Sequence, residues 1–251
     1  MAGRLSAVLG FVVWAMVFGL FFHARSAEAL PDGFGQRTVA QVTEPTALDI
    51  TPDGRMLVTS KPGRLYVVDG GNGSLALDLG SRVCSGSERG LLGVAVDPDF
   101  REAGRKHVYL YYTFDRSGDC SQAVNRVSRF TVSGNTVQPG SERILLNNIP
   151  SSAGNHNGGD VKFGKDKLLY VSVGDGGYDY AGDSGCQGQN DAARDRNSAL
   201  GKILHIRRDG GIPTSNPYTG TDSRRCNLAG GTASGTTARR PLPGASATPS
   251  A

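Results

Sequence analysis

The sequence predicts an all-β fold, and three observations lead to this prediction. Short runs rich in valine and tyrosine are strand-like in composition and length. Glycine is abundant, at 36 of 251 residues, which favours tight turns over a helical bundle. The same order of strand, turn and strand recurs three times. Sheets of about four strands that repeat every 40 to 50 residues or so are typical of β-propeller blades, so we expect an incomplete arc of about three blades.

The first twenty-nine residues are predicted to be a leader outside this fold. Arg4 gives a positive start, residues 7–22 are apolar, and 27–29 have the small-x-small pattern of a cleavage site. These features are typical of a secretory signal peptide. The apolar run is short for a membrane span, which needs about 20 residues, although an uncleaved anchor is the alternative. We therefore expect a secreted or periplasmic protein with no membrane attachment after cleavage.

Each of the three repeats contains a strand, a turn, an apolar second strand, a loop and an alternating third strand. The turns contain the aspartate, glycine and proline residues that turn chemistry requires. Leu48, Val94 and Val161 hold corresponding positions. The three units comprise 47–54, 56–59 and 64–69, then 93–100, 107–113 and 126–132, then 160–167, 168–173 and 201–207.

The end of the chain differs in composition from these repeats. Residues 221–251 are small, polar and rich in proline, with hardly a strand-forming run. Such a segment cannot offset the entropy of ordering, so it is predicted to be disordered. A propeller usually has about 4 to 8 blades, so a partial propeller over 30–220 indicates a natural fragment or a reading frame interrupted near Ala238. A deliberately short protein with a flexible tail is the other alternative.

The cysteine pattern predicts disulfides rather than zinc. Four cysteines follow the leader, and no CxxC spacing occurs. An even number in an exported chain favours disulfides. Cys84 and Cys120 lie in polar loops that flank one predicted strand pair, so we expect them to pair. Cys186 with Cys226 is a weaker second pair.

The stretch NHNGGD at 155–160 contains the candidate catalytic residue. His156 lies between two amides and two glycines, just before a predicted strand. Histidine titrates near neutrality and can act as a general base, although the same stretch also fits a tight structural turn. Gly158 and Gly159 permit unusual backbone angles and are predicted to let a flat ligand approach. His107 and His205 are expected to be strand residues, the second facing solvent or a neighbouring strand.

Three stretches in order resemble the glucose/sorbosone dehydrogenase family. They are SERGLLGVAVDPDF at 87–100, NHNGGDVKFG at 155–164 with LYVSVGDGG at 169–177, and 200–206 followed by 209–213 and 216–218. The resemblance covers about residues 31–228, the first half of a family member. It implies a six-bladed propeller that oxidises the anomeric hydroxyl of an aldose, with hydride transfer to pyrroloquinoline quinone (PQQ) and with calcium.

The resemblance also implies roles for three residues. His156 matches the catalytic histidine that takes the proton of the sugar hydroxyl. Asp175 matches a carboxylate that pairs with this histidine, and such a partner fixes the tautomer and stabilises the imidazolium. Glu88 lies where the family places a quinone-contacting glutamine or glutamate. A sugar and an external electron acceptor are the implied partners.

Other parts of the family pattern are missing from the sequence. PQQ is a tricarboxylate and needs several fixed cationic donors, but the later arginine–asparagine motif and the basic residues that clasp the quinone are absent. The carbonyls that hold calcium are absent too, and Asp160 stands where some relatives carry arginine. We therefore expect this chain to bind PQQ weakly and to be inactive alone. The acidic loop 178–183 could bind calcium, but it lacks EF-hand spacing and a solvated loop is favoured.

Two other functions remain as alternatives. A non-enzymatic propeller of the Hedgehog-interacting-protein type would use the same scaffold for protein recognition. A calcium-dependent lactonase would need clustered acidic ligands from several blades, and the sequence offers no convincing set. Nucleic acid is excluded as a partner, because the net charge is only +4 and no basic stripe is interleaved with aromatic residues.

Overall fold

The computed structural model describes residues 30–151, 153–177, 191–194, 198–217, 223–224 and 237–238. The predicted leader, the loop 178–183, the pair Cys186–Cys226 and most of the predicted tail lie outside the described residues. Residues up to Thr38 form one unit and Val39–Ala251 form another. In the first unit, the Phe34 N–H donates to the Pro31 carbonyl at 3.1 Å. No helix in the described part of the chain is long and apolar enough to cross a membrane.

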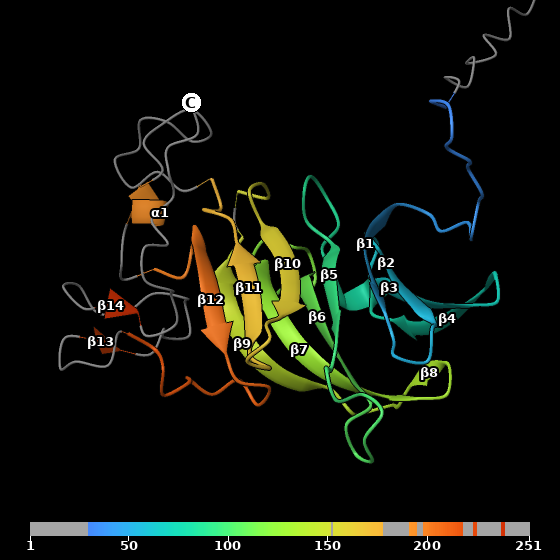
Figure 1. Ribbon diagram of the computed structural model, residues 1–251. Helices are drawn as coiled ribbons and strands as arrows, with labels where there is room; N and C mark the ends of the chain where they lie inside the picture. Colours follow the sequence, from blue (N-terminus) through green and yellow to red (C-terminus); the bar gives the residue numbers. More distant parts are fainter. Residues whose placement is uncertain are drawn as a thin grey trace, which may run out of the picture. The chain divides into compact units, whose positions relative to one another are not determined.

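The second unit is built from three antiparallel sheets, which we call blades 1 to 3 (Figure 1). Each blade begins at one of the three predicted repeats, so the predicted all-β class is confirmed. Blade 1 contains β1 (Pro45–Ile50), β2 (Met56–Ser60), β3 (Arg64–Asp69) and β4 (Asn72–Asp78). Blade 2 contains β5 (Leu91–Val96), β6 (His107–Phe114), β7 (Val124–Ser133), β8 (Thr136–Val137) and β9 (Arg143–Pro150). Blade 3 contains β10 (Gly158–Phe163), β11 (Leu169–Val173) and β12 (Lys202–Ile206).

Four short elements accompany the blades in the described part of the chain. They are a 3₁₀ turn (Gly80–Arg82), the helix α1 (Asp191–Arg194), and the parallel pair β13 (Ser223–Arg224) and β14 (Thr237–Ala238). The last pair lies within residues 221–251, which are predicted to be disordered and to have hardly a strand-forming run.

The blades stand side by side through their first strands. β1 contacts β5, and β5 contacts β10, so these three strands follow one another as the innermost strands of an arc (Figure 1). Gly93 of β5 allows the second of these contacts, because a Cβ there would lie 2.0 Å from the Gly159 carbonyl oxygen. The observed arrangement is therefore the predicted arc of about three propeller blades.

Two hydrophobic clusters fill the junctions between blades. The alternation of side chains along β6 divides them, because successive residues of a strand point to opposite faces. Leu110 faces the first junction, between blades 1 and 2, whereas Tyr109 and Tyr111 face the second junction, between blades 2 and 3. The first cluster includes Leu57, Leu65, Val67, Val94, Val108 and Phe130, and the second includes Val127, Leu146, Val161, Val171, Leu204 and Ile206.

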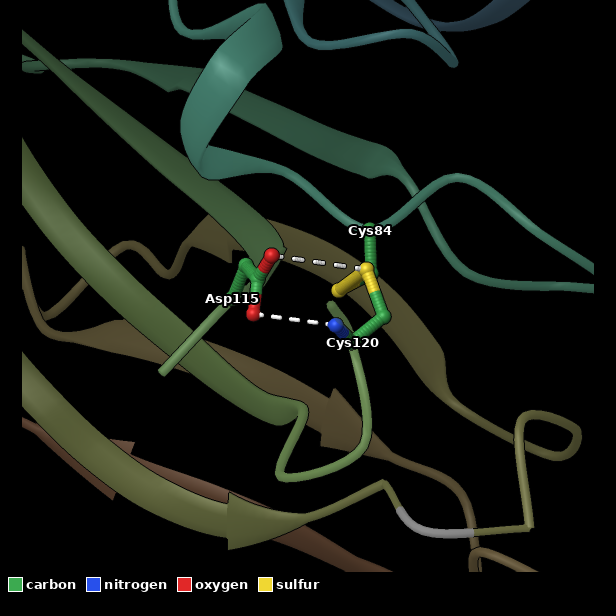
Figure 2. Close-up of side chains that lie close together, drawn as sticks. All are labelled: Cys84, Asp115 and Cys120. Atoms are coloured by element: carbon green, nitrogen blue, oxygen red, sulfur yellow. Dashed lines mark hydrogen bonds between the residues drawn. A yellow bond between two sulfur atoms is a disulfide. The ribbon is translucent and has the colours of Figure 1, made fainter. Parts of the chain in front are cut away.

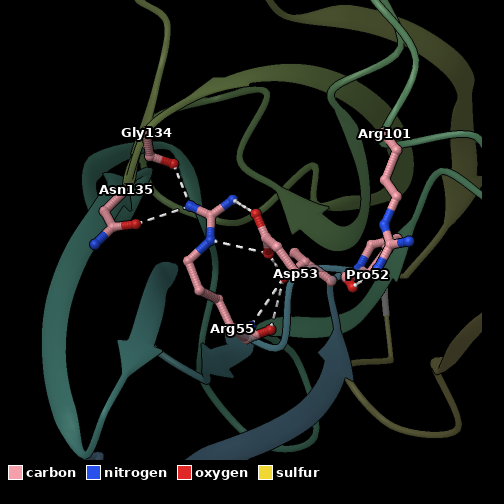
Figure 3. A network of polar contacts seen from close by, with 7 residues as sticks. Pro52, Asp53, Arg55, Arg101, Gly134 and Asn135 are labelled. Atoms are coloured by element: carbon pink, nitrogen blue, oxygen red, sulfur yellow. Dashed lines mark hydrogen bonds and ion pairs between the residues drawn. The ribbon is translucent and has the colours of Figure 1, made fainter.

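Arg55 latches the first junction at its surface. The guanidinium donates to the Gly134 carbonyl at 2.5 Å and to Asn135 Oδ1 at 2.8 Å, both in the β7–β8 turn (Figure 3). The same guanidinium pairs with Asp53 of the β1–β2 turn at 2.8 Å. Arg101 of blade 2 reaches back to a carbonyl of that turn. Polar contacts at the rim therefore supplement the apolar cluster.

The predicted disulfide between Cys84 and Cys120 is present, with the two Cα atoms 5.7 Å apart. It joins the segment that precedes β5 to the loop between β6 and β7. Asp115 organises this loop. Its Oδ1 accepts the Cys120 N–H at 3.1 Å (Figure 2) and the Gly118 N–H at 2.8 Å. Asp115 and the two sulfurs lie close enough to hold a metal ion, but the disulfide uses both sulfurs and removes the thiolates that a metal would need.

Candidate active site

The structure brings His156, Asp175 and Glu88 together. His156 lies in the loop that enters β10, Asp175 follows β11, and Glu88 precedes β5. Three segments that are far apart in the sequence therefore meet where blades 2 and 3 adjoin. The meeting of all three residues was predicted only through the resemblance of their motifs, and their chemical roles stay predictions.

The imidazole of His156 is paired with a carboxylate on one side only. Its Nδ1 lies 2.7 Å from Asp175 Oδ1. An ionised carboxylate can only accept a hydrogen bond, so Nδ1 carries the proton and Nε2 keeps its lone pair in the neutral ring. No hydrogen bond or ion pair engages Nε2 among the residues that the structure describes. The His156 side chain is 37% exposed, so part of the ring is open to solvent.

Asp175 is itself held in place by its own turn. Its Oδ1 accepts the Gly177 N–H at 2.9 Å, and its side chain is only 12% exposed. A carboxylate fixed in this way orients the imidazole and favours the imidazolium once a proton arrives. The pair therefore has the geometry of a general base with its orienting partner.

The backbone of His156 adopts a conformation that is uncommon for a side-chain-bearing residue. Its φ is 50°, in the left-handed region that only glycine adopts at little cost. Gly176 N–H donates to the His156 carbonyl at 3.1 Å. Gly174 packs so closely against the same carbonyl that a Cβ on Gly174 would lie 1.8 Å from its oxygen. Strain of this kind persists where the surroundings impose it, and functional sites often contain it.

A buried polar network lies beneath the histidine loop. Asn157 is 2% exposed, and its Oδ1 accepts from Ser151 Oγ at 2.6 Å and from Asn125 Nδ2 at 3.1 Å. Its carbonyl accepts the Tyr111 hydroxyl at 2.8 Å, and Asn125 Oδ1 accepts from Thr113 Oγ1 at 2.8 Å. Strands β6 and β7 of blade 2 thus anchor the loop of blade 3 that carries the candidate base.

The sequence did not predict that these residues anchor the histidine loop. Asn157 was within the quoted motif, but its partners come from distant strands and carry no motif of their own. The only available signal was the polar ends of β6 and β7, where alternation places Thr113 on the same face as Tyr111.

The two glycines that begin β10 have a structural role. A Cβ on Gly158 would lie 2.5 Å from the Gly174 nitrogen, and one on Gly159 would lie 2.7 Å from Leu92 Cβ. Protein atoms therefore fill the space beside both α-carbons. The atoms beside Gly158 belong to β11 of blade 3 and the residue after it, whereas Gly159 packs against Leu92 of blade 2. That the two glycines let a flat ligand approach stays a prediction.

The remaining predicted histidines lie away from this group. His107 begins β6 with its Nδ1 3.8 Å from Asp97, and burial lowers its pKa. His205 faces a neighbouring strand, since its ring lies against Tyr170 of β11 with centroids 4.7 Å apart. That matches one of the two predicted alternatives.

Comparison with known proteins places this arrangement in a family. A family model described as glucose/sorbosone dehydrogenase matches residues 42–228.

The chain belongs to the glucose/sorbosone dehydrogenase family.

Two solved structures support this assignment. An oxidoreductase (glucose dehydrogenase) from Thermus thermophilus is 31% identical with a TM-score of 0.63, and the match covers 75% of this chain and 52% of that chain. The PQQ-bound aldose sugar dehydrogenase of Streptomyces coelicolor is 32% identical with a TM-score of 0.57, covering 73% and 51%.

A curated relative extends the comparison. The aldose sugar dehydrogenase YliI of Escherichia coli is 26% identical over 191 residues, which is 75% of this chain and 47% of that protein. The chain thus spans about half the length of the relatives it matches.

Proposed function

We propose that the chain carries the proton-accepting part of a sugar dehydrogenase site that oxidises the anomeric hydroxyl of an aldose. The observation that carries this proposal is the 2.7 Å contact between His156 Nδ1 and Asp175, with no hydrogen bond or ion pair to the opposite ring nitrogen among the described residues. Family membership supplies the class of reaction, and the pair supplies a base for it. We also propose export from the cytoplasm, which rests on the leader-like composition of residues 1–29.

The proposed reaction requires His156 to accept a proton. Nε2 accepts the proton of the sugar hydroxyl as the carbon–hydrogen bond at the anomeric carbon breaks. Asp175 accepts the hydrogen bond of Nδ1–H and stabilises the positive ring that results. PQQ, when bound, would accept the hydride that leaves that carbon. The sugar becomes a lactone, and an external acceptor must reoxidise the quinone.

The described residues fit the base and do not fit the anion-binding part of a PQQ site. Glu88 and Asp175 are both carboxylates, and neither forms an ion pair with lysine or arginine among the described residues. Arg89 lies next to Glu88 in sequence, but its guanidinium donates to the Ser151 carbonyl at 3.0 Å. A tricarboxylate needs fixed cations, so we expect this chain alone to bind PQQ weakly.

A chimera provides the sharpest test of the base. Residues 39–217 would replace the matching half of the Streptomyces coelicolor aldose sugar dehydrogenase, and reduction of an acceptor dye by several aldoses would be followed with PQQ and calcium. We expect turnover that falls by about 10²-fold or more in His156→Ala. His107→Ala is the matched control, because His107 also faces an aspartate but lies away from the site, and it should keep its turnover. Undiminished turnover in His156→Ala would show that another group is the base.

The chain alone tests the alternative function. Calorimetry with PQQ and the same dye assay should reveal weak binding and little turnover. If the chain binds no PQQ and the folded chimera is inactive, a non-enzymatic propeller that recognises another protein becomes the better proposal.

A further inference from the structure

Contacts restrain the backbone of His156 at both its carbonyl and its N–H. On the carbonyl side, Gly176 N–H donates to the His156 oxygen and Gly174 packs against it. On the amide side, the His156 N–H donates to Glu88 Oε2 at 2.6 Å. The loop makes a second contact with the same residue, since Glu88 N–H donates to the Gly154 carbonyl at 3.1 Å. Glu88, just before β5, therefore contacts the histidine loop at two points, the Gly154 carbonyl and the His156 N–H.

We propose that Glu88 is a positioning residue for His156 rather than a ligand for the quinone. Its carboxylate makes a short, charge-assisted hydrogen bond to the backbone of the candidate base, and such bonds are stronger than neutral ones. The bond favours the left-handed φ of 50°, from which the ring reaches Asp175. This inference rests on the proposed function only in taking His156 as the base.

The negative charge of Glu88 also argues against a role in binding the quinone. A carboxylate beside a tricarboxylate places like charges together, which opposes binding. The same negative charge strengthens the hydrogen bond that Glu88 accepts from the His156 N–H. A glutamine would keep an acceptor oxygen for the N–H, so the positioning role predicts that an amide can replace the acid.

Arg89 extends the same restraint along the loop. Its guanidinium Nε donates to the Ser151 carbonyl at 3.0 Å and to Ser151 Oγ at 3.3 Å. Ser151 Oγ in turn donates to Asn157. The consecutive residues Glu88 and Arg89 thus fasten both the start and the centre of the segment 151–157, and Glu88 contacts the base itself.

The experiment reads the tautomer of His156 by ¹⁵N NMR of the full chain labelled at histidine. The chain has 4 histidines, and His156→Gln assigns the resonance. In the native protein we expect one protonated and one unprotonated ring nitrogen with well-separated shifts. Glu88→Ala should move the two shifts toward each other as the contact with Asp175 is lost. Glu88→Gln should restore the separation.

A matched control distinguishes positioning from general destabilisation. Glu142 is another hydrogen-bonded glutamate of blade 2, which accepts from Ser128 Oγ at 2.8 Å and pairs with Arg82. Glu142→Ala should lower the melting temperature and leave the His156 shifts unchanged. The proposal is overturned if Glu88→Ala leaves the shifts separated, if Glu88→Gln disturbs them as much as alanine, or if Glu142→Ala collapses them equally. The readout needs neither quinone nor sugar, so its result is independent of whether the dehydrogenase proposal holds.

Discussion

The two junctions between blades share a hydrophobic core but differ in what surrounds it. The first junction combines aliphatic and aromatic side chains with polar contacts between the blades, such as the Arg55 latch at its rim and the bond from the Val96 N–H to Asp49 Oδ2. The second has a comparable apolar cluster, but at the end nearest His156 it changes to the buried network of Thr113, Asn125, Asn157 and Ser151. Apolar burial is non-directional, whereas a satisfied buried network imposes one geometry. The candidate site therefore lies on the junction where a buried side-chain network fixes orientation.

The largest effect on stability is expected in the first junction, from Leu110→Ala. Leu110 is 0% exposed in that cluster, and emptying such a position costs about 4 kcal/mol of the free energy of unfolding. Urea denaturation measures the loss. The ¹⁵N shifts of His156 should stay as in the native protein. A change in those shifts would show that the two junctions are not independent.

Removal of the disulfide is expected to have the next largest effect. Cys84 and Cys120 are separated by 36 residues, and opening a loop of that length costs about 3 to 4 kcal/mol in the chain-entropy model. The double alanine variant avoids a free thiol, and its urea denaturation midpoint gives the cost. The His156 shifts should again be unaffected. A loss well below this range would indicate that the unfolded chain without the disulfide retains structure that already restrains this loop.

Asn157→Leu should have a smaller effect on stability and a larger one on the site. It removes the acceptor of Ser151 Oγ and Asn125 Nδ2, and leaving buried donors unsatisfied costs about 2 to 3 kcal/mol. Urea denaturation should show this loss, and NMR should show that His156 no longer keeps a fixed tautomer. Because the two residues are coupled, adding Asn125→Leu should cost less than the sum of the single changes. Strict additivity, or unchanged shifts, would contradict the network's orienting role.

The strands of the fold were predictable because their signals are local. The runs at 56–59 and 64–69 combine β-branched residues with turn residues between them, and β2 and β3 formed there. β4 and β9 were missed. Most of β4 is exposed, so its residues show little apolar pattern, and β9 begins with two exposed residues and contains two asparagines.

The candidate site was only partly predictable, for a different physical reason. His156, Asp175 and Glu88 lie within recognisable motifs, so their positions could be named. The residues that hold them in place could not be predicted, because Ser151, Asn125 and Thr113 approach Asn157 only after blades 2 and 3 pack together. The same holds for Glu88, whose contact is with the backbone of His156 and so depends on a loop conformation that sequence does not reveal.

The smallest effect is expected at the rim of the first junction, and it depends on pH. The hydrogen bond from Arg55, helped by one from Thr51, lowers the pKa of Asp53 to about 2. A carboxyl whose folded pKa is below its unfolded value of 3.8 stabilises the protein above that value, and the contribution disappears as pH falls through about 2. Asp53 is 53% exposed, so solvent screening limits the contribution to less than about 1 kcal/mol.

Asp53→Asn measures this contribution directly. Its free energy of unfolding should lie slightly below that of the native protein at pH 5 and low salt, and the difference should vanish near pH 2. Added salt should reduce the difference at pH 5, because the ion pair reaches solvent. A difference that survives at pH 2 would mean that the Asp53 side chain acts through hydrogen-bond geometry in the turn. In that case the rim of the first junction would resemble the second junction, where orientation rather than charge makes the contact specific.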